Sequence, residues 1–324
     1  MTPYAIAGIQ MHVSAAHDNV AAMLHQLDVL MARFPWVQMV LFSELAPYGP
    51  MIEHAQTFPN DTERAFQEAA ARHGVWVIPG SMFETVEGRV YNTASVIDSQ
   101  GRIAGRYRKM FPFRPYEQGV DGGTEFMVFD VPGVGRFGLS ICYDIWFPET
   151  CRTLTSMGVE VLLHPVLTGT IDRDVEISIA RASAAMFQCY VVDVNGLGAG
   201  GVGRSCVFDP TGTQIHLAAG QQELIAVEID LDQVRRQREV GMKGLGQLHK
   251  SFRDRPVEFP VYDRAAFDAS YLNTLGPLQI PAKGSRAGLD VPPPGSFAPT
   301  TLLSGTTAAA APPQLDAHLP EVAE

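Results

Sequence analysis

The chain has 324 residues, of which 46% are hydrophobic, and a formal net charge of −11 at pH 7. This length allows one large domain or two modest ones, and the composition is that of an ordinary globular protein. Binding to nucleic acid requires a concentrated basic face, so the acidic balance argues against a nucleic-acid partner. The charge favours solubility but indicates no particular partner.

Cysteine and histidine usage argues against disulfides and metal sites. The four cysteines include no CxxC pair, and the nine histidines form no HExxH or other ligand-spaced cluster. Residues 1–34 lack the basic start, apolar core and cleavage site of a signal peptide. No apolar run approaches the ~18 residues of a membrane span. We therefore expect a reduced, cytoplasmic protein with no metal and no membrane partner.

Patterns typical of helices and strands alternate along most of the chain. Apolar or alternating runs predict strands at residues 4–11, 37–42, 75–78, 91–98, 102–110, 135–141, 159–163, 189–194, 205–208, 214–217 and 224–229. Recurrence at three- and four-residue steps predicts helices at residues 20–34, 61–73, 148–157 and 174–188. Asp18 or Asn19 could cap the first helix, and Gly74 ends the second. This alternation indicates an α/β protein with mixed sheets.

The end of the chain differs in composition. Nine of the 23 prolines lie between residues 277 and 320, among Ala, Gly, Ser and Thr. Such a segment buries too little apolar surface to offset its ordering entropy. We predict one domain over residues 1–274 and an irregular or disordered Pro/Ala-rich tail over residues 275–324. An arm that lies on a partner subunit is the alternative, which no periodicity supports.

Residues 135–149 read as a strand, a cysteine and the start of a helix. Apolar and polar or small residues alternate up to Ile141, and Pro148 followed by Glu149 suits the first turn of a helix. Cys142 therefore stands where a strand ends and a helix begins. Backbone N–H groups and the helix dipole can lower the pKa of a thiol there, which would favour the nucleophilic thiolate. A buried structural cysteine is the alternative.

Charged side chains also follow two other predicted strands. Glu44 ends an apolar run, where desolvation would raise its pKa and suit it to proton transfer. By strand parity Lys109 shares the apolar face, while the arginines of its strand take the solvent face. Glu117 follows eight residues later and could fold back beside Lys109. Open α/β sheets place their sites at the carboxyl ends of strands, so we predict a Glu–Lys–Cys site. The alternatives are a surface glutamate and a lysine that extends to solvent.

These motifs together resemble those of the nitrilase superfamily, the carbon–nitrogen hydrolases. The family pattern is a glutamate after an apolar strand, a Y-R-K segment, and G-x-x-I-C-Y-D-x-x-F-P-E. Here Phe42-Ser-Glu44, Tyr107-Arg-Lys109 and residues 138–149 match it in order, within a resemblance over roughly residues 4–260. The resemblance implies a four-layer α-β-β-α sandwich with two mixed β-sheets, which usually pairs across its helical layer into homodimers or larger homo-oligomers.

The resemblance also implies a mechanism for a small-molecule, amide-type substrate. Cys142 would attack the carbonyl and form a thioester, with Glu44 as the proton acceptor. Lys109 and the backbone N–H of Tyr143 would hold the oxyanion, and Glu117 would position Lys109 and the substrate. Nitrile-cleaving relatives tend to carry Trp-Glu where this chain has Tyr143-Asp144, which favours an amide or carbamoyl amide. A nitrilase and an acyltransferase that passes the thioester to an amine are the alternatives.

The substrate pocket is predicted from residues near these motifs. Aromatic side chains could line an apolar acyl pocket or belong to the core; they are Tyr48, Phe111, Phe113 and Trp146. His164 and Pro165 begin a loop after another predicted strand and could also contribute. Met186-Phe187 stands where relatives often carry an acidic residue or Ala followed by Asn. Residues 198–205 nearly match a phosphate-binding loop but precede a strand, so no nucleotide or other cofactor is expected.

Overall fold

The computed structural model describes residues 1–281, which belong to two compact units, Met1–Val257 and a second unit from Glu258 onward. The described part of the second unit contains a 3₁₀ turn at Pro260–Tyr262 and the short helix α7 (Ser270–Asn273). Most of the predicted tail, from residue 282, lies outside the described residues. The predicted boundary between residues 274 and 275 stays a prediction.

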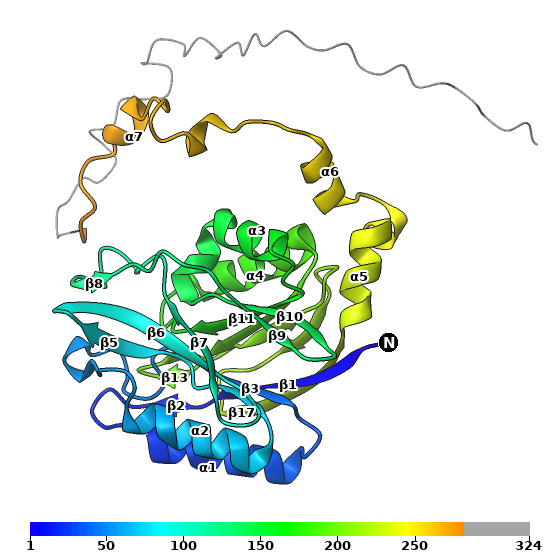
Figure 1. Ribbon diagram of the computed structural model, residues 1–324. Helices are drawn as coiled ribbons and strands as arrows, with labels where there is room; N and C mark the ends of the chain where they lie inside the picture. Colours follow the sequence, from blue (N-terminus) through cyan, green and yellow to red (C-terminus); the bar gives the residue numbers. More distant parts are fainter. Residues whose placement is uncertain (282–324) are drawn as a thin grey trace, which may run out of the picture. The chain divides into compact units, whose positions relative to one another are not determined.

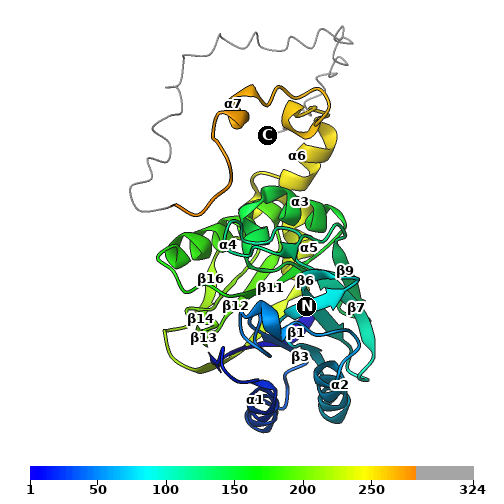
Figure 2. The same ribbon diagram turned by 90° about the vertical axis from the view of Figure 1, so that its left-hand side faces the viewer.

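The first unit is built of four layers (Figures 1 and 2). Helices α1 (Val20–Arg33) and α2 (Asp61–His73) cover the outer face of one sheet. Helices α3 (Pro148–Ser156) and α4 (Arg173–Phe187) cover the outer face of another. The inner faces of the two sheets pack together. The α-β-β-α sandwich implied by the family resemblance is confirmed.

The first sheet contains parallel and antiparallel pairs. Its order is β17 (Glu223–Asp230), β1 (Pro3–Gln10), β3 (Met39–Phe42), β4 (Trp76–Ile78), β6 (Arg89–Ile97) and β5 (Met82–Val86), with β7 (Ile103–Arg108) and β8 (Val120–Asp121) also paired to β6. Strands β1, β3 and β4 run parallel, whereas β6 and β7 form the predicted antiparallel hairpin. Crossover helices join the parallel strands, since α1 lies between β1 and β3 and α2 between β3 and β4, whereas short turns join β5 to β6 and β6 to β7.

The second sheet has its own parallel centre. Its order is β16 (Gln214–Leu217), β15 (Cys206–Phe208), β12 (Tyr190–Asn195), β11 (Val161–Val166), β10 (Gly135–Leu139) and β9 (Met127–Val131). Strands β10, β11 and β12 run parallel. A small third sheet, absent from the prediction, joins β2 (His12–Val13), β13 (Leu197–Gly198) and β14 (Gly201–Val202). The glycine-rich segment thus contributes the short antiparallel strands β13 and β14 and then leads into a further strand, as its sequence predicts.

Strand alternation distributes the apolar side chains among three cores. In β3, Met39 and Leu41 face the second sheet, while Val40 and Phe42 face α1 and α2. In β11, the side chain of Leu162 instead packs toward α3 and α4. Burying one such side chain contributes roughly 1.5–3 kcal/mol. Central strands buried on both faces therefore hold the layers together.

Helix boundaries agree with the predicted ones for the first four helices, with one difference in capping. Asn19 occupies the N-cap position of α1, but its side-chain oxygen accepts the backbone N–H of Ser14 at 2.9 Å instead of capping the helix. Helices α5 (Leu231–Val240) and α6 (Leu248–Asp254) were not predicted. Only three residues of α5 are buried, so its apolar periodicity is weak.

Candidate active site

The candidate nucleophile lies on a tight turn at the end of β10. Cys142 begins a 3₁₀ turn, Cys142–Trp146, and has a φ of +47°. This left-handed conformation is uncommon for a residue with a Cβ and is found preferentially at functional sites. The side chain is buried, and its thiol lies 3.8 Å from the carbonyl oxygen of Leu167, just after β11. The turn therefore directs the thiol toward the edge where the parallel strands end.

The Asp144 carboxylate holds this turn in place. Its Oδ2 accepts the backbone N–H of Ile141 at 2.9 Å and the hydroxyl of Tyr107 at 2.7 Å. Its Oδ1 accepts the backbone N–H of Phe111 at 2.8 Å. Burial raises the pKa of Asp144 to about 6, although these donors favour the ionised form. One carboxylate thus ties the nucleophile's turn to β7 and to the loop that follows it.

Lys109, just after β7, lies between the carboxylates of Glu44, shortly after β3, and Glu117, in the loop before β8. Its Nζ donates to Glu44 Oε1 at 2.8 Å and to Glu117 Oε2 at 2.9 Å. Asn92 of β6 donates from Nδ2 to the same Glu44 oxygen at 2.8 Å. Glu44 and Lys109 are 2% and 1% exposed, so the pair is shielded from solvent. The structure thus brings the predicted carboxylates and lysine together beside the cavities that contain Cys142.

Burial and neighbouring charges together determine the protonation of Glu44 and Lys109. Burial raises the pKa of Glu44 more than the attraction of Lys109 lowers it, and Glu117 raises it further. Burial alone would lower the pKa of Lys109, but Glu44, Cys142 and Glu117 together raise it well above its usual range. Lysine therefore remains a cation while Glu44 is poised to accept a proton. Such a combination of a fixed cation and a raised carboxyl pKa is typical of acid–base sites.

The thiol differs from the expectation of a lowered pKa. Burial raises the pKa of Cys142 well above its usual range, the Glu44 carboxylate raises it further, and Lys109 only partly opposes both. A thiolate here would add a third negative charge beside a single cation. Cys142 therefore rests as a neutral thiol, and a nucleophilic thiolate would form only when a nearby base takes its proton.

Two small cavities meet at Cys142. The first, of about 220 Å³, is lined by Glu44, Leu45, Pro50, Phe83, Lys109, Phe113, Tyr116, Glu117, Cys142 and Leu167. The second, of about 140 Å³, is lined by Phe113, Cys142, Tyr143, Leu167, Thr168, Gly169, Thr170, Asp172 and Glu176. The first contains the ionisable groups around the thiol, and the second extends away from them. Their volumes suit a small substrate.

The predicted pocket residues fall into two groups. Phe113 and Tyr143 line the cavities, and their rings meet edge to face with centroids 5.0 Å apart. Trp146 does not line them, but its indole N–H donates to Glu176 Oε1 at 3.3 Å. Tyr48 lies elsewhere, hydrogen-bonded through its hydroxyl to Thr62 Oγ1 at 2.5 Å. Their roles toward a substrate stay predictions.

His164 and Pro165 belong to the interior of β11 and do not line either cavity. His164 is buried, and its Nδ1 lies 2.8 Å from Ser140 Oγ. Burial lowers the pKa of His164 to about 4, so the ring is neutral near pH 7. Wall residues instead come from the segment just beyond, at residues 167–170. Met186 and Phe187, at the far end of α4, likewise do not line the cavities.

Sequence reasoning missed three polar residues of the site. Asn92 interrupts a strand that is otherwise apolar on that face, a signal that could have suggested a specific partner. Asp144 was noted only as a marker of substrate class, and Glu176 lies in a helical pattern typical of a surface face. Their contacts join residues more than 25 positions apart, namely Asn92 to Glu44, Tyr107 to Asp144 and Trp146 to Glu176. Such pairings follow from the fold and not from local spacing.

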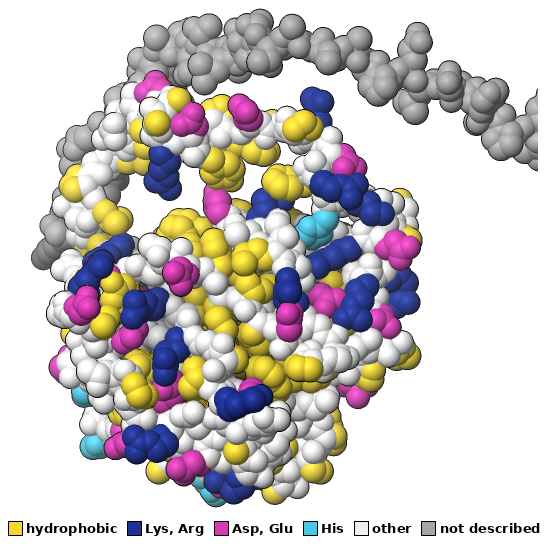
Figure 3. All heavy atoms as spheres, viewed as in Figure 1, with side chains coloured by type: hydrophobic (Ala, Val, Ile, Leu, Met, Phe, Trp, Pro, Cys, Tyr) yellow, Lys and Arg dark blue, Asp and Glu magenta, His cyan; other side chains and the backbone are white. Residues whose placement is uncertain are grey.

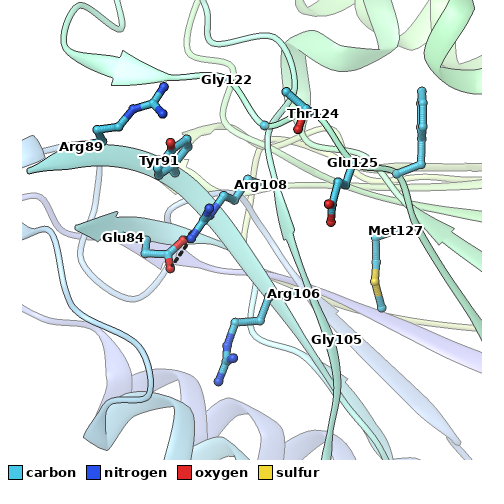
Figure 4. Close-up of a pocket in the computed structure, with 12 residues that line it drawn as sticks. Glu84, Arg89, Tyr91, Gly105, Arg106, Arg108, Gly122, Thr124, Glu125 and Met127 are labelled. Carbon is cyan, nitrogen blue, oxygen red and sulfur yellow. Dashed lines mark hydrogen bonds and ion pairs between the residues drawn. The ribbon is translucent and has the colours of Figure 1, made fainter. Parts of the chain in front are cut away.

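A larger cavity, of about 530 Å³, lies among outward-facing residues of β7 and its neighbours (Figure 4). Arg108 donates from Nε and Nη2 to Glu84 at 2.8 and 3.0 Å, and its guanidinium lies over the Tyr91 ring. Arg106 pairs in the same way with Glu63, at 2.7 and 2.8 Å. The prediction that these arginines take the solvent face is therefore only partly right, because carboxylates bind both guanidinium groups. Cys142 does not line this cavity.

Within residues 1–281, no helix is long and apolar enough to cross a membrane. The same part of the chain contains no group of three or more His, Cys, Asp or Glu side chains placed to hold a metal ion. Its four cysteines are free and buried. On the face shown in Figure 3, acidic and basic side chains are intermixed.

The matching family model is decisive for the family. The model of the carbon-nitrogen hydrolases matches residues 5–239. The chain belongs to the carbon-nitrogen hydrolase family. This confirms the resemblance to the nitrilase superfamily, and the matched residues include every residue of the site described above.

Named relatives of this family are amidases. The chain is 32% identical to 2-oxoglutaramate amidase of Bacillus subtilis over 173 residues, which are 52% of this chain and 66% of that protein. It is 31% identical to deaminated glutathione amidase of Dictyostelium discoideum over 191 residues, covering 52% and 65%. It is 27% identical to an omega-amidase of Danio rerio over 260 residues, covering 71% and 90%. The chain thus spans just under two thirds of the first two relatives.

Solved structures share the fold. A carbon-nitrogen hydrolase from Helicobacter pylori superimposes with a TM-score of 0.69 at 24% identity, covering 81% of this chain and 99% of that one. An amidase from Nesterenkonia sp. gives a TM-score of 0.64 at 21% identity, covering 77% and 96%. At these identities the likeness supports the architecture alone.

Proposed function

We propose that this protein hydrolyses the carbon–nitrogen bond of a small amide or carbamoyl amide through a cysteine thioester. The observation that carries the proposal is the buried arrangement of Glu44, Lys109 and Glu117 in the cavity that Cys142 also lines. A buried lysine shared by two carboxylates is costly to fold, and a strained cysteine beside it adds to that cost. The amidase relatives support the same reaction class.

In the first half-reaction, Glu44 accepts the thiol proton while the sulfur of Cys142 attacks the carbonyl carbon. The carbonyl oxygen becomes an oxyanion, which the Lys109 ammonium and the backbone N–H of Tyr143 stabilise. Glu44 then returns the proton to the leaving nitrogen, the carbon–nitrogen bond breaks, and ammonia or an amine departs. The raised pKa of the Glu44 carboxyl suits it to hold this proton between the two steps.

In the second half-reaction, Glu44 accepts a proton from water as the water oxygen attacks the thioester. The same donors stabilise the second oxyanion, and the carbon–sulfur bond breaks to release the acid. The proton on Glu44 returns to the sulfur of Cys142. Glu117 keeps Lys109 oriented throughout, because it binds the same ammonium and also accepts the backbone N–H of Phe113.

The proposal is tested by measuring ammonia or amine release from amides, carbamoyl amides and nitriles, with Cys142→Ala as the matched control. We expect release from amides, and a Cys142→Ala variant that folds but does not hydrolyse. Near-native turnover by Cys142→Ala would contradict the proposal. Preferred release from nitriles would instead support a nitrilase.

Trapping distinguishes hydrolysis from acyl transfer and tests the thioester. Added hydroxylamine should intercept the acyl group and yield a hydroxamate in competition with water, since both attack the same intermediate. Wild-type protein should form it and Cys142→Ala should not. Product found only when an amine acceptor is present, with no free acid, would indicate an acyltransferase.

A further inference from the structure

The second cavity at Cys142 has an acidic wall. Its wall includes the carboxylates of Glu176 and Asp172, and within the described residues no lysine or arginine lines it. Glu176 is 5% exposed and Asp172 is half-buried. The same cavity reaches the thiol, and Glu176 is close enough to raise the pKa of Cys142. A charge so placed acts on whatever occupies the cavity.

The contacts of Glu176 leave its charge only partly balanced. Its Oε1 accepts the indole N–H of Trp146 at 3.3 Å, and its Oε2 lies 3.3 Å from Arg173 Nη1. Both distances are long for hydrogen bonds to an ionised carboxylate. Burial raises the pKa of Glu176 and the Asp193 carboxylate raises it further, while a hydrogen bond from the Thr168 side chain and the Arg173 guanidinium only partly oppose this increase.

Arg173 is committed to another carboxylate. It is buried, its Nη2 donates to Asp193 Oδ1, and its Nη1 lies 3.3 Å from Asp193 Oδ2. Its Nη2 also donates to the carbonyl oxygen of Arg204 at 2.9 Å. One guanidinium thus faces two carboxylates, so this buried group has a net charge of −1. Nearby His164 adds no positive charge, because its ring is neutral near pH 7.

The position of the charge indicates which part of a substrate it meets. The first cavity contains Glu44 and Lys109, which must face the leaving nitrogen and the oxyanion. The second extends from Cys142 past Tyr143 and Thr168 to Glu176. Thr168 is fixed there, because its backbone N–H and carbonyl oxygen both bond to the Asn195 side chain, at 3.0 and 3.1 Å. The wall that leads from Cys142 to Glu176 is therefore both fixed and acidic.

We propose that Glu176 forms a cation-binding subsite and that the preferred amide carries an ammonium group on its acyl portion. This inference rests on the proposed function and adds a substrate class to it. A carboxylate at the same position would face Glu176 without a counter-ion, and like charges in a shielded site repel strongly. A bound ammonium would neutralise the carboxylate and so also ease removal of the thiol proton, since Glu176 disfavours the thiolate.

A charge series of equal length tests the subsite. Pentanamide, 4-aminobutanamide and 4-carbamoylbutanoate differ only in a terminal methyl, ammonium or carboxylate group, and the series is repeated with one methylene fewer and one more. We expect kcat/KM to be highest for the ammonium amide, lower for the methyl amide and lowest for the carboxylate amide. The first and last should differ by about tenfold or more, which corresponds to a free-energy difference of about 1.4 kcal/mol or more. Carboxylate amides hydrolysed as well as ammonium amides at every length would overturn the proposal.

Matched variants connect the preference to one side chain. Glu176→Gln keeps the shape and leaves Arg173 balanced by Asp193, so we expect a folded protein that loses most of its preference for ammonium over carboxylate amides. Asp174→Asn is the control, since Asp174 lies on the same helix turn, is 75% exposed and binds Arg204 instead of the cavity. A preference that survives Glu176→Gln, or that Asp174→Asn also removes, would refute the assignment.

A binding measurement separates this inference from the proposed function. Calorimetry with Cys142→Ala compares the affinities of 4-aminobutanamide and 4-carbamoylbutanoate without any turnover. Tighter binding of the ammonium amide that depends on Glu176 supports the subsite even when hydrolysis is absent. Hydrolysis of pentanamide that depends on Cys142, together with equal binding of both charged amides, overturns the subsite alone.

Discussion

The cation on the outer face of β7 and the cation at its inner end differ in how many carboxylates they bind. Outside, Arg108 has one carboxylate, and this pairing, together with a bond from Thr93, lowers the pKa of Glu84 even though burial opposes it. Inside, Lys109 is shared by two carboxylates, and the pKa of Glu44 is raised because burial outweighs the shared attraction. One cation for each carboxylate stabilises charge, whereas one cation for two carboxylates leaves a group ready to take a proton. The same strand thus supports structure on one face and chemistry on the other.

The largest expected effect is that of removing the inner cation. Lys109→Gln should lower kcat by on the order of 10²–10³, because the oxyanion loses a donor. Two buried carboxylates then lack their partner, so we also expect a loss of unfolding free energy of roughly 3–5 kcal/mol. Steady-state kinetics and denaturant unfolding measure both. A variant within about tenfold of wild-type kcat would remove Lys109 from the mechanism.

The Asp144 anchor should be the next most sensitive. Asp144→Asn replaces one acceptor oxygen by an amide that cannot accept, so one of the three donors at this residue loses its partner. A displaced nucleophile can cost about 10² in rate, and an unpaired buried donor about 1–3 kcal/mol of stability. We expect kcat to fall with little change in KM. Asp130→Asn is the control, since it removes a surface partner of Arg136 and should leave kcat unchanged.

The pH dependence of kcat/KM should distinguish the inner face of β7 from its outer face, with a smaller effect than the two substitutions above. Glu44 must be ionised to accept the thiol proton, and its pKa is raised, so kcat/KM should fall with decreasing pH earlier than for an ordinary carboxyl group. Because Glu117 contributes to that increase, Glu117→Gln should move the acid limb of its residual activity to lower pH. The raised pKa of Lys109 keeps the oxyanion donor charged at alkaline pH.

Measuring kcat/KM as a function of pH for the wild-type and Glu117→Gln proteins determines this shift. An acid limb that stays in place, or that moves to higher pH, would contradict the coupling between the two carboxylates. Arg108→Gln should leave the limb unchanged, because its guanidinium serves the outer face.

The smallest effect is expected on the outer face. Arg108 is 40% exposed, and half-exposed ion pairs contribute ~1 kcal/mol or less. Arg108→Gln should therefore lower the melting temperature by a few degrees at most and leave kcat within about twofold. Calorimetric melting and amide turnover measure the two. A large loss of activity would mean that the faces are coupled through the strand.

Local patterns predicted that Glu44, Lys109 and Cys142 share a site because each stands at the end of a recognisable strand. The structure brings them to one cavity, and their roles in a reaction stay predictions. Parity placed Lys109 inside and the arginines outside, and the order of the motifs joined Glu44 to Cys142. The pattern did not indicate that Arg106 and Arg108 would find carboxylates, since Glu63 lies on α2 and Glu84 on β5. Those contacts depend on how the layers meet.

The predicted wall of the substrate pocket shows more clearly what local sequence patterns cannot indicate. His164 was expected in its wall on the ground that a strand ends there, but β11 continues to Val166 and buries the ring. Strand ends are uncertain by a few residues, and a shift of that size moves the pocket wall to residues 167–170. The sequence gives no sign that Glu176 of α4 is buried, because its contact with Trp146 joins residues 30 positions apart.

The positive φ of Cys142 has a consequence for how this chain has been selected. A glycine would adopt that conformation more easily, by about 1 kcal/mol, and would leave the turn anchored by Asp144 unchanged. The chain therefore holds a residue with a side chain at a torsion that favours glycine, and the proposed reaction is what would require it: at this one backbone torsion, conformational preference opposes the proposed role of the thiol.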